Sequence, residues 1–182
     1  MTRITLALAG LLLLAGCGGM TIEDFEGTEP VFVPEQYFPG RTRVWGVFYD
    51  RSGSVRRQFT ADVEGRLEDG VLVLDEAFQF KDGATDTRVW RLENLGDGRY
   101  EGTANDVIGT AEIRIEGQAI NLNYDVDLEV GDETYQVHFD DWLILQEGDV
   151  VVNRATVTKF GFTVGELIAF FQKVEPPAAG AS

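Results

Sequence analysis

The sequence predicts an all-β protein: an antiparallel up-and-down barrel of about 8–10 strands that ends in one short helix. Three observations carry this prediction. Apolar residues alternate with polar ones in a succession of short runs from about residue 41. Turns rich in glycine and aspartate separate these runs. The apolar spacing changes to that of a helix only in 163–173. A two-sheet sandwich is the alternative architecture.

The turn signal at Asp69–Gly70 defines the pairing of the strands on either side of it. It places Leu67 opposite Leu72 and Ala61 opposite Phe78. Apolar residues therefore meet on one face, as a sheet with one buried face requires. Consecutive hairpins of this kind close into a lipocalin-like barrel, whose inward positions fill the centre or leave room for one ligand.

The most regular strand, 120–130, has an apolar residue at every even position. Pairing it with the following strand through a tight turn places Tyr124 opposite Phe139 and Val126 opposite Val137. We expect these four side chains to line the interior of the barrel, where they would contact a ligand.

A carboxylate falls on the same apolar face, because this pairing places Asp141 opposite Leu122. A two-residue turn at Gly148–Asp149 would then place Asp141 opposite Thr156 and diagonal to Arg154. The pattern therefore predicts an inward ion pair between Asp141 and Arg154.

This ion pair has two interpretations. With Thr156 beside it, it is a candidate site for the acidic head group of an apolar ligand, because the fork of Arg154 suits a carboxylate. Alternatively, it is a buried pair that defines the strand register. A bulge at Asp140–Asp141 would exchange the two aspartates between the faces of the sheet.

The first sixteen residues have the features of a bacterial lipoprotein signal. Arg3 is followed by the apolar run 6–14, and the run ends in a lipobox-like Leu-Ala-Gly-Cys sequence at Cys17. Cleavage there would leave Cys17 to be acylated, with palmitate among its chains, and two chains suffice for stable anchoring. Gly18 favours sorting to the outer membrane, facing the periplasm. An ordinary secretory signal with an incidental cysteine is the alternative.

These boundaries divide the chain into four parts. We expect a signal peptide over 1–16, a lipidated tether over 17–40, the barrel with its terminal helix over 41–174, and a disordered tail over 175–182. The tether contains three of the five prolines and little periodicity.

Composition argues against several functions. A net charge of −16 disfavours binding to nucleic acid or to anionic lipid head groups. The only cysteine is Cys17, and the only histidine, His138, falls on the outward face, so a histidine triad or a multi-histidine zinc site is not expected. We expect no catalytic residue, no cofactor and no metal.

The lipobox and three later segments resemble a family of Gram-negative lipoproteins catalogued only as a domain of unknown function. The segments are DRSG (50–53), RVWRLENLGDGRYEGTANDVIGTA (88–111) and FDDWLILQEGDVVVNRATVTKFGFTVGEL (139–167). The resemblance covers nearly all of the mature chain. It implies a periplasm-facing, lipocalin-like lipoprotein without assigned activity, encoded near fatty-acid-modifying enzymes. It implies no functional residue beyond Cys17.

Together these features predict a non-enzymatic outer-membrane lipoprotein that binds or shuttles a lipid or fatty-acid-like ligand in its barrel. Its partners would be the membrane, through the acyl chains, and that ligand. One alternative is a structural or assembly lipoprotein of the envelope, acting through a surface around Trp142 and the terminal helix. The other is a lipid-modifying enzyme.

Overall fold

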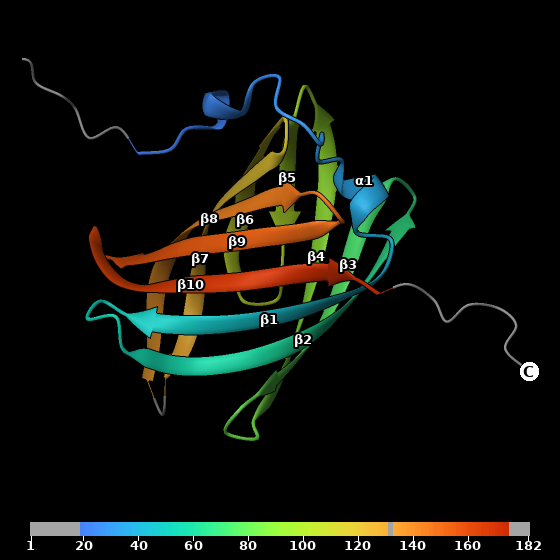
Figure 1. Ribbon diagram of the computed structural model, residues 1–182. Helices are drawn as coiled ribbons and strands as arrows, with labels where there is room; N and C mark the ends of the chain where they lie inside the picture. Colours follow the sequence, from blue (N-terminus) through green and yellow to red (C-terminus); the bar gives the residue numbers. More distant parts are fainter. Residues whose placement is uncertain (1–18, 131–132, 175–182) are drawn as a thin grey trace, which may run out of the picture.

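Ten antiparallel strands close into a barrel in the computed structural model, which describes residues 19–130 and 133–174 (Figure 1). Each strand pairs with its neighbours in sequence, and β1 closes the ring against β10. The strands are β1 (Gly40–Asp50), β2 (Val55–Glu68), β3 (Val71–Phe80), β4 (Thr85–Gly96), β5 (Arg99–Thr103), β6 (Val107–Glu116), β7 (Ala119–Val130), β8 (Glu133–Gln146), β9 (Val150–Lys159) and β10 (Phe162–Lys173). The predicted up-and-down barrel is confirmed, and the sandwich is excluded.

Two pairings predicted from turn signals are also confirmed. In β2 and β3, Leu67 lies opposite Leu72. In β7 and β8, Tyr124 lies opposite Phe139. The same registers pair Ala61 with Phe78 and Val126 with Val137.

The helix expected at 163–173 is wrong, because this segment is strand β10. Ala169 and Phe171 pack into the barrel core, whereas Ile168 and Phe170 alternate with them on the outer face. Apolar residues therefore occupy both faces of β10. This hides the period-two alternation and imitates the apolar stripe of a helix.

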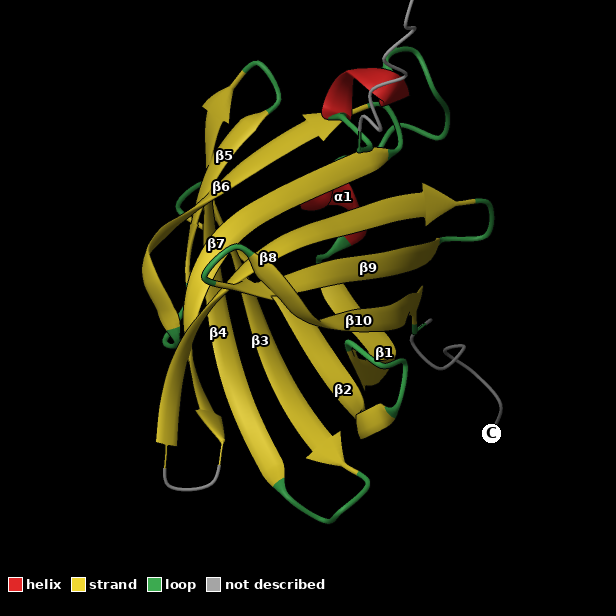
Figure 2. Cartoon of the chain, turned by 90° about the vertical axis from the view of Figure 1, so that its left-hand side faces the viewer, coloured by secondary structure: helices red, strands yellow, loops and turns green. Residues whose placement is uncertain are grey.

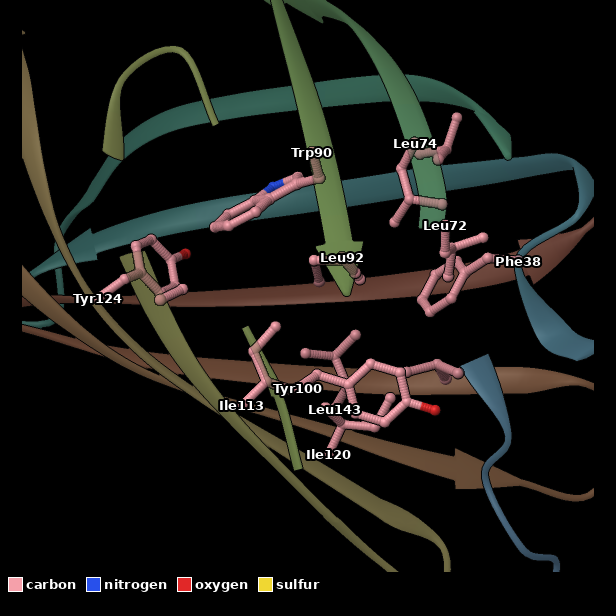
Figure 3. Packing of buried hydrophobic residues seen from close by; sticks show 14 of the residues in the cluster. Phe38, Leu72, Leu74, Trp90, Leu92, Tyr100, Ile113, Ile120, Tyr124 and Leu143 are labelled. Carbon is pink, nitrogen blue, oxygen red and sulfur yellow. The ribbon is translucent and has the colours of Figure 1, made fainter. Parts of the chain in front are cut away.

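The segment before β1 closes one end of the barrel. It contains η1 (Ile22–Phe25) and α1 (Pro34–Tyr37). Phe32, Tyr37 and Phe38 are buried in the core, and the Tyr37 ring lies 5.0 Å from that of Phe38. We call residues 32–38 the plug. Figure 3 shows Phe38 in the core cluster near Leu72.

In its described part, the expected tether 17–40 is thus a folded element and not a free linker. Among the described residues, no helix has the length and apolar character needed to cross a bilayer. The predictions for the signal peptide 1–16, for Cys17 and for the tail 175–182 concern residues outside the described ranges.

The end of the barrel opposite the plug holds the turns β1–β2, β3–β4 and β9–β10, and we call it the mouth. In Figure 2 the two helices lie above the β3–β4 turn, which is at the bottom of the view. Side chains fill the interior near the plug, as Figure 3 shows for Leu92, Ile113, Ile120 and Leu143.

Gly65 on β2 lets the plug dock closely against the barrel. A β-carbon at this position would overlap the carbonyl oxygen of Phe38, a backbone atom that no side-chain rotation can move.

We expect Gly65→Ala to lower the free energy of unfolding by about 1–3 kcal/mol in urea denaturation. Gly19→Ala, which faces open space, is the matched control. If both variants were as stable as the wild type, the plug would not be docked as described.

Candidate functional site

Polar side chains gather inside the barrel among its apolar lining. Strand alternation turns them inward: Glu76 follows buried Leu74 on β3, and Arg88 precedes buried Trp90 on β4. Strands β7, β8 and β9 and the β5–β6 loop contribute the others. We call the set the polar cluster; it consists of Glu76, Arg88, Asp106, Tyr124, Asp141 and Asn153.

Asp141 is the most deeply buried acid of this cluster, with 8% of its surface exposed. The Tyr124 hydroxyl donates a hydrogen bond to its carboxylate at 3.2 Å, and the side-chain amide of Asn153 donates another. Burial raises the pKa of Asp141 to about 6, although both hydrogen bonds oppose the shift. The predicted inward position of Asp141 is confirmed.

The predicted ion pair between Asp141 and Arg154 is wrong. Asp141 lies opposite Ala155, so Arg154 and Thr156 point out of the barrel. Arg154 instead forms an ion pair with Glu166 on the outer surface, where 64% of its side chain is exposed. Neither Arg154 nor Thr156 lines the interior.

The β8–β9 turn explains this error. Gln146 pairs with Val150, so the loop has three residues and not two. Gly148 and Asp149 both adopt positive φ angles, as a longer hairpin loop of this kind requires. A shift of one residue moves every side chain of β9 to the other face. It therefore brings Asn153 into the interior in place of Arg154.

The other four predicted lining residues do face the interior. Tyr124, Val126 and Val137 are buried in the core cluster, and Phe139 packs against it. Tyr124 stacks on Phe139, with the ring centroids 5.2 Å apart, and meets Trp90 edge-on at 5.3 Å. Figure 3 shows the rings of Tyr124 and Trp90 approaching from different strands.

Glu76 and Arg88 are functional candidates that the sequence analysis missed. They lie directly opposite each other on β3 and β4. Arg88 donates to Asp106 through Nε at 3.1 Å and also through a terminal guanidinium nitrogen. The missed signal was the same as for Asp141: Glu76 interrupts an otherwise apolar face in the run Leu72, Leu74, Glu76, Phe78, Phe80.

The Glu76 carboxylate has no such partner. No described side chain forms a hydrogen bond or an ion pair with it. Burial raises its pKa to about 7, and the positive charge of Arg88 opposes this shift only in part. Glu76 is thus an acid on the inside of the barrel whose pKa is raised toward neutral pH.

Toward the mouth, inward-facing apolar side chains keep some contact with solvent. They include Phe48, Phe59, Phe78, Leu122, Leu128 and Phe139. Because these side chains face the inside of a closed barrel, their partial exposure means that solvent reaches this part of the interior from the mouth. We call this part of the interior the lumen. Glu76 is partly exposed in the same way.

A groove of about 390 Å³ opens beside the mouth. Its lining residues are Asp125, Thr134–His138 and Thr158–Gly161. His138 lies on the outer face, as predicted, and its Nδ1 is 2.9 Å from Asp125. The ammonium group of Lys159 lies 3.8 Å from the centre of the Tyr135 ring.

The surface patch expected around Trp142 is wrong, because Trp142 is buried and its ring lies 5.9 Å from that of Phe25. A different apolar patch is exposed on the outer face of β1 and β10. There Trp45 lies opposite Phe170, and each is nearly half exposed.

A family model described as a protein of unknown function (DUF3833) matches residues 11–173, which is most of the chain. The resemblance to a family with a domain of unknown function is thereby confirmed. No curated protein matches the sequence.

The corrected register predicts which side chain supports Asp141. At pH 8, Asn153→Ala should lower the free energy of unfolding by about 1–3 kcal/mol, because it removes a donor from a buried carboxylate. Arg154→Ala removes only an exposed ion pair and should cost less than about 1 kcal/mol. Urea denaturation of both variants measures the difference. If Arg154→Ala were more destabilising than Asn153→Ala, the result would contradict the described register and support the Asp141–Arg154 ion pair.

Proposed function

The chain belongs to the DUF3833 family, and we propose that it is an outer-membrane lipoprotein whose barrel binds or shuttles an apolar ligand with a polar head group. One observation carries the proposal: inward-facing aromatic and aliphatic side chains stay partly exposed inside a barrel that is plugged at one end. Binding sites for small molecules are typically concave, mostly apolar, and equipped with a few polar groups that orient the ligand.

The plug blocks one end of the barrel, which leaves the mouth as the route for a ligand. Tyr37 donates a hydrogen bond to the carbonyl of Asp149 at 3.1 Å, and Tyr100 donates one to Glu35 at 2.8 Å. These bonds and the buried aromatic rings hold the plug against several strands. A ligand would therefore enter and leave through the mouth.

An acyl anchor at Cys17 would orient the barrel. Cys17 stands two residues before Gly19, and two residues reach at most about 7 Å. The first element, η1, packs on β6 and β7, and the carbonyl of Phe25 lies against Gly117 in the turn at the plugged end. The bilayer would lie nearer to that end, so the mouth would open into the periplasm.

We propose binding and not catalysis. Two interior carboxyl groups with raised pKa values, those of Glu76 and Asp141, are of the kind that acid–base chemistry uses. Among the described residues, however, their hydrogen-bond partners are only Tyr124 and Asn153. No serine or threonine hydroxyl there forms a hydrogen bond with either acid.

A second candidate function is an envelope assembly role through the outer surface. The exposed cross-strand pair of Trp45 and Phe170 favours it, because large aromatic side chains are typical of protein interfaces. In this case, Trp45→Ala would impair function, and changes inside the barrel would not.

Blocking the lumen tests the main proposal. Leu122 faces the interior opposite Asp141 and is partly exposed. We expect Leu122→Trp to weaken the binding of N-phenyl-1-naphthylamine, a neutral fluorescent apolar probe, at least tenfold, because the larger side chain fills the lumen. Arg154→Ala, on the outer face, should bind like the wild type. If circular dichroism shows that Leu122→Trp is folded and this variant binds the probe normally, the lumen is not the binding site. If Leu122→Trp does not fold, Leu128→Trp repeats the test.

The anchor is tested separately in cells. Cys17→Ser should abolish labelling with radioactive palmitate and release the protein from the outer-membrane fraction, because no thiol remains to be acylated. Gly18→Asp is the matched variant: it should keep the label and move to the inner-membrane fraction. Membrane retention of unlabelled Cys17→Ser would contradict lipid anchoring.

A further inference from the structure

We propose that the polar cluster binds a positively charged nitrogen, so that the ligand is an amphiphilic amine and not a fatty acid. Such a ligand has a protonated nitrogen on an apolar body. This inference rests on the proposed function and specifies the head group. It replaces the acidic head group that the expected Asp141–Arg154 pair would have favoured.

The balance of charge inside the barrel is the first reason. The polar cluster contains three carboxyl groups, those of Glu76, Asp106 and Asp141, but only one cation, Arg88. Asp106 already pairs with Arg88. A carboxylate ligand would have to displace Asp106 from Arg88 and then lie near two further acids. A cation would meet unmatched negative charge.

The hydrogen-bonding groups give a second, independent reason. One carboxylate oxygen of Asp106, Oδ1, is buried and has no partner among the described residues. The Glu76 carboxylate also receives no hydrogen bond there. Buried polar atoms are normally paired, so Oδ1 of Asp106 calls for a donor, and the partly exposed carboxylate of Glu76 can accept a further hydrogen bond. An ammonium group supplies up to three N–H donors, whereas a carboxylate supplies none.

Aromatic rings surround the same acids. The Tyr124 hydroxyl contacts Asp141, and the Tyr124 ring packs between those of Trp90 and Phe139. Phe78 follows Glu76 on the same inward face of β3. Carboxylates together with aromatic faces are the combination that recognises organic ammonium groups through cation–π contacts. Within the cluster, the guanidinium of Arg88 already lies over Trp90, 5.9 Å from its ring centre.

A metal ion fits these acids less well than an organic cation. Within residues 19–130 and 133–174, no three histidine, cysteine, aspartate or glutamate side chains converge as metal ligands. The other cations near the lumen, Arg57 and Lys159, lie at the mouth, where solvent screens them. Arg57 is also 4.0 Å from Asp82. They would not prevent an ammonium group from reaching Glu76.

The pH dependence of binding should distinguish an amine from an acid. Glu76 faces Arg88 on β4, Asp106 in the β5–β6 loop, Tyr124 on β7 and Asp141 on β8. The pKa values of about 7 for Glu76 and about 6 for Asp141 mean that both acids are partly protonated in slightly acidic solution. An ammonium ligand favours their ionised forms and releases protons on binding, so its affinity should rise from pH 5 to pH 8. The affinity of a fatty acid should fall over the same range.

The experiment compares three ligands of equal chain length on the chain from Gly19 onward, which contains the plug and the whole barrel. Dodecylamine, dodecanol and dodecanoate, each below its micelle concentration, compete with N-phenyl-1-naphthylamine at physiological salt. We expect dodecylamine to displace the probe at a concentration at least tenfold lower than dodecanol, with dodecanoate weakest. The advantage of the amine should grow from pH 5 to pH 8.

Two isosteric variants separate the lumen from the acidic surface. Glu76→Gln should weaken dodecylamine binding at least fivefold and leave dodecanol binding within about twofold. Glu64→Gln, which removes an exposed charge from the outer face of β2, should change neither. Equal effects of the two variants on dodecylamine would indicate adsorption to the surface and would overturn the proposal.

The outcomes also distinguish this inference from the proposed function. If the probe binds and dodecanoate competes as well as dodecylamine, the head-group proposal is wrong and the ligand-binding barrel stands. If the probe does not bind to the wild-type protein, the proposed function fails, and this inference fails with it.

Discussion

Closure of the barrel is the constraint on which the rest of this structure depends. Because β1 pairs with β10, every strand has a neighbour on both edges, and each side chain points either to the inside or to the outside of the barrel. Strand parity therefore decides the chemistry of the interior. A polar residue at an inward position must find partners inside or border water, which is the situation of Glu76, Arg88 and Asp141.

The interior combines two unlike halves. Near the plug it is packed like an ordinary core, with Phe32 and Phe38 sealing the end of the barrel. Toward the mouth the aromatic lining keeps contact with solvent, and carboxyl groups lie among the rings. Burial in apolar surroundings raises the pKa values of Glu76 and Asp141. Ionised carboxylates at these positions therefore reduce the stability of the fold, which points to a role other than stabilisation. Buried acids without a matching cation are rare unless they serve a ligand or a reaction.

How far sequence reasoning succeeded depended on the turn that joined each pair of strands. The Asp69–Gly70 turn has two residues, so counting outward from it gave the correct β2–β3 register. The β8–β9 loop has three, and the same counting placed Arg154 inside when Asn153 belongs there. In β10, apolar residues on both faces concealed the strand, and no local pattern separated it from a helix.

The sequence alone determined the all-β class and the hairpin order, and it favoured an inward Asp141 over the bulged alternative with Asp140, because alternation and tight turns are local properties of the chain. The tertiary structure decided what Asp141 meets. Glu76 on β3 and Arg88 on β4 come near Asp141 on β8 only when the ring closes, and the plug reaches its place only through contacts with several strands. Such contacts depend on the register of every strand pair between the residues concerned. An error of one residue in any of these registers moves side chains from the inside of the barrel to the outside.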